Sequence, residues 1–182
     1  TDGLNASISG SATSTGSFGT LRLKDDVMIG QFGSSNFIFA KEGDQPFGGG
    51  SSNIAIGNDV LGDQGPTTGD DNIAMGSRAL RYLTSGHDNI ALGGFALNYV
   101  TSTSGNIGIG LYAGHYMRGG TDNIFIGRYS GFGGVEVSPY TSVNYNIGIG
   151  YKALSEVLGN NNVAIGHEAA LYASSGSSNT FI

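Results

Sequence analysis

The 182-residue sequence contains no cysteine and no tryptophan, and only 3 of its residues are proline. Without cysteine there can be no disulfide, no thiolate nucleophile and no thiolate zinc site. Charged residues make up 12% of the chain, and 14 acidic residues against 8 basic ones give a net charge of -6. A nucleic-acid-binding protein that depends on a basic surface is therefore not expected. No apolar run approaches the roughly 20 residues that span a bilayer, so membrane insertion is not expected either.

Glycine, by contrast, is abundant. The chain has 33 glycines, which is too many for an ordinary enzyme, yet 38% of its residues are hydrophobic, which is too many for a disordered linker. An internal repeat resolves this conflict.

The repeat consists of asparagine, a large apolar residue, a small residue, a second apolar residue and glycine. A degenerate copy begins at Asn36 and a truncated copy at Asn179. Successive motif asparagines are 17, 19, 17, 17, 17, 23, 16 and 17 positions apart. The commonest of these spacings is the length of one unit, and the longer ones indicate insertions near 63–69 and 128–145. The clear copies begin at Asn53, Asn72, Asn89, Asn106, Asn123, Asn146 and Asn162.

Each motif reads as a short strand with its two large apolar side chains on one face. The residue between them is usually Ala or Gly, as at Ala74 and Gly108, with Phe125 as an exception that we expect to fill a local gap. Side chains this small indicate that another backbone approaches closely, and we expect sister chains to supply it. The fold class is therefore mainly β: an elongated, homotrimeric β-solenoid or β-roll.

The segment after each motif leaves two interpretations open. Its apolar residues lie one, three and four positions apart, as at Ala79, Leu80 and Leu83, which is typical of a short helix. Stacked strands, however, are about 4.8 Å apart, whereas packed helices need about 8 to 10 Å. Either the segment is extended or tightly wound, or coils of other chains lie between successive strands of one chain.

The first part of the chain differs from the repeats. Residues 1–30 form a Ser/Thr/Gly-rich lead-in or cap, with alternation over 20–24 that predicts a half-buried strand, and residues 31–182 form the repeat domain.

Three sets of residues are candidates for a role. The motif asparagines are most simply structural, because stacked amide side chains form ladders. Recurrent tyrosines ten positions after the asparagine, and aromatic residues of the second insertion, either pack or contact a ligand. We take as binding candidates Tyr82, Tyr99, Tyr116, Phe132, Tyr140 and Tyr145.

Asp71, Asp88 and Asp122 each precede a motif asparagine and are weak candidates for Ca²⁺ ligands, although Asp is also common in turns. No other metal and no cofactor is expected. The three histidines fall at different phases of the repeat, and neither a His-Glu-x-x-His spacing nor a nucleophile elbow is present, so we do not expect an enzyme.

The Asn-Ile-Ala-Ile-Gly units resemble the repeats of trimeric autotransporter adhesin heads. They are still more similar to the longer Asn-x-Ala-Ile-Gly-x-x-Ala-Leu repeats of phage tail fibres, and Ala79-Leu80, Ala96-Leu97 and Ala153-Leu154 carry that extension. The resemblance covers about residues 30–182. Adhesin-head units are shorter than the unit of this chain, so their coil geometry is not transferred directly.

The resemblance implies a homotrimeric fibre on a virion tail or an extracellular cell surface. Such a fibre would bind a host-surface glycan or protein, with weak contacts strengthened by multivalency. The alternative is a purely structural spacer or filament subunit without a receptor site of its own.

Overall fold

The computed structural model describes residues 50–62, 67–133, 143–156, 159–172 and 176–182 in full. It also describes the backbone of residues 21–23, 27–30 and 37–41. The binding candidate Tyr140 lies outside these residues, as do residues 1–20 of the lead-in. No helix is present in the described ranges.

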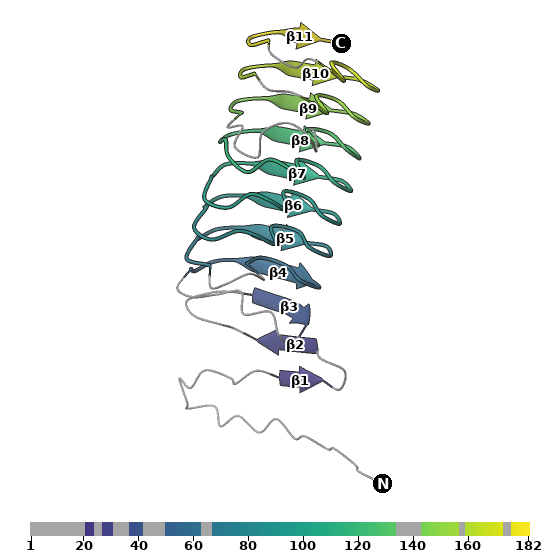
Figure 1. Ribbon diagram of the computed structural model, residues 1–182. Helices are drawn as coiled ribbons and strands as arrows, with labels where there is room; N and C mark the ends of the chain where they lie inside the picture. Colours follow the sequence, from purple (N-terminus) through teal and green to yellow (C-terminus); the bar gives the residue numbers. More distant parts are fainter. Residues whose placement is uncertain are drawn as a thin grey trace.

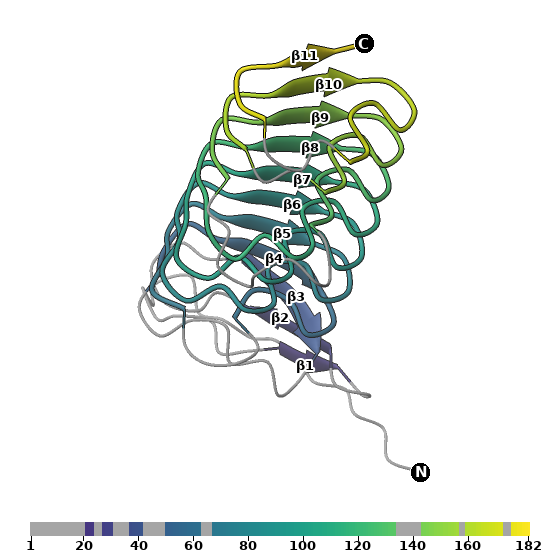
Figure 2. The same ribbon diagram turned by 45° about the horizontal axis from the view of Figure 1, so that its top comes forward.

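The strands form a single sheet whose order follows the sequence. They lie one above another in an elongated stack (Figure 1), and the connecting segments return on one side of the sheet to close each coil (Figure 2). The strands are β1 (Leu21–Leu23), β2 (Val27–Gly30), β3 (Phe37–Lys41), β4 (Ile54–Gly57), β5 (Ile73–Met75), β6 (Ile90–Leu92), β7 (Ile107–Ile109), β8 (Ile124–Ile126), β9 (Ile147–Ile149), β10 (Val163–Ile165) and β11 (Thr180–Phe181).

The pairing of the strands is antiparallel at the start and parallel afterwards. β2 pairs antiparallel with β1 and with β3, and the strand expected at 20–24 is confirmed as β1. From β3 onward each strand pairs in parallel with the next, so that Ile90 faces Ile107 and Ile107 faces Ile124. The predicted β-solenoid and the length of its repeat unit are confirmed. Since successive strands of one chain pair directly, the alternative that coils of other chains lie between them is wrong.

The segment after each motif is tightly wound, and its helical interpretation is wrong. The backbone N–H of Leu80 donates to the Ala96 carbonyl at 3.1 Å, and that of Leu97 to the Ala113 carbonyl at 2.9 Å. These bonds join one coil to the next, whereas a helix would satisfy its own backbone. Alternate residues take positive φ, as at Arg78 (60°) and Leu80 (49°). The segment thereby bonds to both neighbouring coils, since the N–H of Arg78 donates to the Asn58 carbonyl of the preceding coil at 2.8 Å and the N–H of Leu80 donates to the following coil. The apolar spacing resembled a helix because this winding also turns side chains one, three and four positions apart, such as Ala79, Leu80 and Leu83, into the interior.

The small residues of the strands face the interior of the coil, not a sister chain. Ala74 and Ala91 are completely buried, and a Cβ added to Gly108 would lie 2.7 Å from Leu97 Cγ and 3.2 Å from the Ala113 carbonyl oxygen. The close backbone that the small side chains predicted is therefore present. It belongs to the second segment of the same chain, and this corrects the expectation that sister chains supply it.

The core is a narrow column of aliphatic side chains that includes Leu80 and Leu97. Phe125 is 1% exposed and pairs with Gly108 on one side and Gly148 on the other. The leucine position of the second segment is Gly114 and Gly131 in the two coils around this ring, and a Cβ on either would contact it. The expectation that Phe125 fills a gap is confirmed, because its ring occupies the volume that leucines fill elsewhere.

The motif asparagines form a ladder that runs from Asn53 to Asn179 and is buried as far as Asn162. Asn106 shows the pattern: its Oδ1 accepts from the backbone N–H of Asn123 at 3.1 Å and from Asn123 Nδ2 at 3.0 Å. Its own Nδ2 donates to Asn89 Oδ1 at 3.2 Å and to the Gly120 carbonyl at 3.0 Å. The predicted structural role is supported at Asn53, Asn72, Asn89, Asn106, Asn123, Asn146 and Asn162, each of which is 0% exposed.

The ladder predicts that a single asparagine side chain in the middle of the stack contributes strongly to the stability of the fold. Asn106→Ala leaves buried donors and acceptors of two neighbouring coils unpaired, and we expect it to lower the free energy of unfolding by about 3 kcal/mol or more. The control Asn58→Ala removes an exposed amide and should change the free energy of unfolding by less than about 0.5 kcal/mol. Urea denaturation of both variants measures the difference, and equal stabilities would contradict the ladder's role.

Candidate functional site

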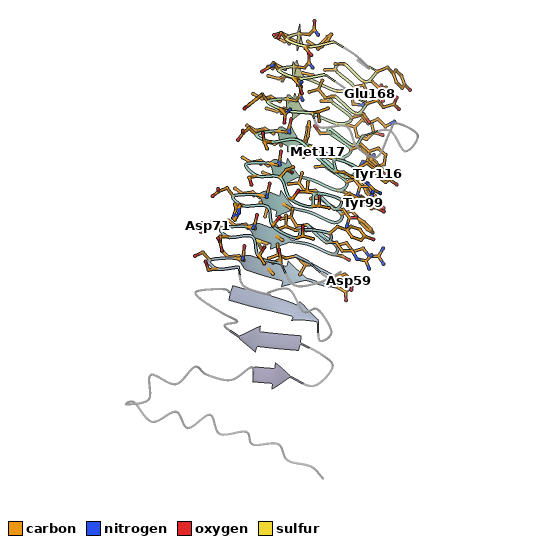
Figure 3. All side chains as sticks on the ribbon, turned by 60° about the vertical axis from the view of Figure 1, so that its left-hand side comes forward. Asp59, Asp71, Tyr99, Tyr116, Met117 and Glu168 are labelled. Atoms are coloured by element: carbon orange, nitrogen blue, oxygen red, sulfur yellow. The ribbon has the colours of Figure 1, made fainter. Side chains whose placement is uncertain are left out.

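The turn that follows each motif glycine brings aromatic rings together along one side of the solenoid. We call this surface the aromatic edge. It lies on the side of the stack opposite the turn that holds Asp71, as the labelled Tyr99 and Tyr116 show (Figure 3). Its rings belong to Tyr82, Phe95, Tyr99, Tyr112, His115, Tyr116, Tyr129, Phe132 and Tyr151.

The first column of the edge consists of the predicted tyrosines. The ring centroid of Tyr99 lies 4.8 Å from that of Tyr82 and 5.3 Å from that of Tyr116, with interplanar angles of 14° and 18°. These distances match the rise of stacked strands, so the repeat places one ring per coil. Both faces of Tyr99 are covered by its neighbours. A ligand can therefore reach the edges of these rings but cannot lie flat on Tyr99.

A second column stands six positions after the motif asparagine. Phe95, Tyr112 and Tyr129 stack at 4.9 and 5.2 Å, and all three have positive φ. The column continues below through Arg78, whose guanidinium lies 5.2 Å from the Phe95 ring and 3.3 Å from the Asp59 carboxylate. Each stacked pair contributes roughly 0.5 to 1.5 kcal/mol beyond simple burial, which offsets the cost of the left-handed backbone.

His115 lies between the two columns. Its ring packs edge-on against Tyr99, Tyr112 and Tyr116 and stacks on Phe132 at 5.6 Å. Its Nδ1 lies 3.1 Å from the Phe95 carbonyl oxygen, which can only accept, so this nitrogen carries the proton. Burial lowers the pKa of His115 below its usual value, since the rings around it replace the water that would solvate an imidazolium.

Cations lie over the rings of the edge. The Arg118 guanidinium carbon is 5.1 Å from the Tyr99 centroid, and that of Arg128 is 4.9 Å from the Tyr151 centroid. Arg81 and Lys152 lie over Tyr82 and Tyr151 at 5.4 and 5.3 Å. Such contacts contribute about 0.5 to 1 kcal/mol at an exposed site and hold the long side chains against the surface.

The opposite turn is polar and acidic. Asp71, Asp88 and Asp122 occupy one position of the repeat, are exposed and have positive φ of 56–57°. Asp tolerates this conformation better than most residues, which accounts for its recurrence there. No group of three or more His, Asp or Glu side chains able to hold a metal ion occurs among the described residues. Calcium at these aspartates stays a sequence-based hypothesis.

A second polar column stands two positions before each motif asparagine. Here a backbone N–H donates to the side chain of the following coil, as from Ser51 to Asp70 Oδ1 at 2.7 Å and from Asp70 to His87 Nδ1 at 3.1 Å. The hydrogen bond from the Ser51 backbone lowers the pKa of Asp70 below its usual value. These side chains complete the hydrogen bonding of the turn.

The structure divides the predicted binding residues between two sides of the molecule. Tyr82, Tyr99, Tyr116 and Phe132 come together on the aromatic edge, where Phe132 lies 5.1 Å from Tyr116. Tyr145 lies instead on the acidic turn, at the same repeat position as Asp122, and is 57% exposed.

Sequence reasoning missed the column of Phe95, Tyr112 and Tyr129, and with it the cations and His115. The signal was available, because the three rings recur at the spacing of the repeat and sit at one position of it. It was obscured because that position holds Asp59, Arg78, Lys152 or Glu168 in other coils.

Comparison of the chain with known proteins finds no matching family model, no matching curated protein and no matching solved structure. Within the described ranges, nothing forms a helix of the length and apolarity that crossing a bilayer requires.

The buried histidine predicts a pH dependence. Because the pKa of His115 is lower in the folded than in the unfolded chain, the unfolded chain binds a proton first as the pH falls below about 6.5, and stability is lost. We expect His115→Phe to reduce the loss of unfolding free energy between pH 7.5 and 5.5. The control His167→Gln, which alters an exposed histidine, should show the same loss of unfolding free energy as the wild type. Identical pH profiles for wild type and His115→Phe in urea titrations would contradict this account.

Proposed function

We propose that this chain is a segment of a non-enzymatic, homotrimeric attachment fibre, of the kind found on phage tails or bacterial surfaces. In this proposal the solenoid sets the length and stiffness of the fibre, and side chains at its turns contact a glycan or protein on the host surface. The resemblance of the repeats to tail-fibre and adhesin repeats motivates the proposal.

The observation that carries the trimer is the outer face of the sheet. On each of β4 to β10 the central residue is buried and the two flanking residues point outward, half-buried or exposed. These outward residues form two continuous columns of Ile, Leu, Val and Met without a charge, and Met75 and Ile165 are 40% and 44% exposed. Contiguous apolar faces of this kind are typical of subunit interfaces.

A parallel stack is also suited to three-fold assembly. The apolar columns run along the long axis, so copies arranged around that axis can bury them over the full length of the repeat. The proposed assembly leaves the aromatic edge and the acidic turn, at the two ends of each strand, as the surfaces that meet the environment.

Catalysis is left out of the proposal for a chemical reason. His115 is enclosed by rings and its Nδ1 is engaged with a carbonyl. His87 lies on the opposite turn, and the exposed His167 stacks on Tyr151 at 5.1 Å. Ser51 Oγ donates to Asp70 Oδ1 at 3.0 Å, but the pKa of this carboxyl is lowered by its hydrogen bonds with Ser51, which makes it a weak general base.

The assembly has a direct test. Light scattering of the purified chain should give three times the 18.6 kDa of one chain. Replacing Ile109 and Ile126, in one apolar column, by Lys should yield monomers, because charges would be desolvated in the interface. Ser102→Lys adds a charge to an exposed turn and should leave the trimer intact. A monomeric wild-type chain at micromolar concentration would refute the trimer.

Attachment and a purely structural spacer make different predictions for the second insertion. Ser130 and Val143 at its ends are buried, so only residues 134–142 should be replaced, by a short Gly/Ser link, together with Tyr145→Ala. If the insertion binds the receptor, attachment to host cells and glycan-array signals should fall at least about tenfold through the loss of aromatic anchors. Ser102→Ala, on an exposed turn away from the binding candidates, should have no effect. Unchanged attachment would reject the insertion as the receptor site, and it would favour the spacer if no other surface of the chain is needed for attachment.

A further inference from the structure

Positive charge is concentrated on one side of this acidic protein. The chain has 8 basic residues in all, and five of them lie on the aromatic edge: Arg78, Arg81, Arg118, Arg128 and Lys152. The turns that follow β5 to β8, as far as they are described, contain four of these arginines and no carboxylate. Asp59, Glu156 and Glu168 lie on this side in the outer coils, as the labels of Asp59 and Glu168 show (Figure 3), whereas the aspartates of the central coils lie on the opposite turn. The field is therefore positive at the central coils of the edge although the net charge is -6.

Two of the arginines are available to an incoming anion. Arg118 and Arg128 are exposed, and within the described ranges neither forms an ion pair. Their guanidinium groups lie over Tyr99 and over Tyr129 and Tyr151. The rings orient these guanidiniums without neutralising them, so less side-chain entropy is lost when an anion binds.

The shape of the edge selects a linear partner. Rings and cations follow the solenoid axis through the coils of β5 to β9, a length of about 19 Å at a rise of about 4.8 Å per coil. Ring faces within the columns are covered by neighbouring rings, as for Tyr99, so the edge presents ring edges and guanidiniums instead of an open stacking platform.

The density of charge distinguishes between linear polyanions. Arg118, Arg128 and Lys152 stand in three successive coils and provide about one positive charge per 4.8 Å, whereas duplex DNA carries one negative charge per about 1.7 Å. A polysaccharide with a carboxylate on each sugar, or on alternate sugars, has a lower density that fits this edge. The planar guanidinium also matches a carboxylate in two-point hydrogen bonding.

We infer that the aromatic edge binds a linear, carboxylate-bearing polysaccharide laid along the solenoid axis, with Arg118 and Arg128 as its principal anion contacts. This inference rests on the proposed attachment function and names the class of receptor. It places recognition at the aromatic edge, in addition to the insertion considered above.

The test measures binding of the full chain to polygalacturonate, with dextran as the uncharged control and duplex DNA as the alternative polyanion. Polygalacturonate should bind at 50 mM salt and weaken at 300 mM, because the contacts are exposed and screened. The double variant Arg118→Gln, Arg128→Gln should bind about tenfold more weakly. Arg22→Gln, which removes one charge from β1, should stay within twofold of wild type. Circular dichroism verifies that each variant is folded.

Three results would overturn the inference: dextran binding as strongly as polygalacturonate, DNA binding more strongly, or the double variant binding normally. A parallel cell-attachment assay separates this inference from the proposed function. Cells that bind the wild type and the double variant equally would reject the edge as the receptor site and leave attachment standing. Binding to polygalacturonate without attachment to any cell would reject the attachment function and leave the edge site standing.

Discussion

The hydrogen bonding of the buried motif asparagine is the constraint on which the rest of this structure depends. A planar amide of this length accepts from the following coil while it donates both to the preceding and to the following coil, and at Asn106 these bonds are 3.0 to 3.2 Å long. Aspartate would lack the donor and leucine would lack both groups, so either would leave buried polar atoms unpaired. The ladder thereby fixes the register of the strands from β4 to β11, and the strand register fixes the spacing of the other side chains in these coils.

Once the coils are held at strand separation, every repeat position becomes a column along the axis. Asparagines stack in the interior, tyrosines stack at 4.8 to 5.3 Å on one turn, and isoleucines line the outer face of the sheet. The same constraint explains the unusual backbone. Arg78 and Leu80 accept left-handed conformations because only this winding lets the second segment bond to both neighbouring coils at that rise.

The three sides of each coil differ in chemistry. The sheet face is apolar and uncharged, the turn before the strand carries Asp71, Asp88 and Asp122, and the turn after it carries the rings and most of the cations. The proposed trimer buries the first and leaves the other two exposed. This arrangement connects the proposed assembly with the proposed recognition. Each edge would repeat one weak contact along the solenoid axis, and a trimer would present three such edges, so that binding is multivalent.

The sequence by itself determined the period, the strand positions, the structural role of the asparagines and the gap filled by Phe125, because each depends on contacts that recur at a fixed spacing. It did not decide whether the segment around Ala79 and Leu80 was helical, since inward side chains three and four apart arise from either a helix or this winding. Nor did it reveal that Ala74 faces its own chain, or that Arg118 lies over Tyr99. Only the tertiary structure decides these, because they depend on how far one coil lies from the next and on which way each turn directs its side chains.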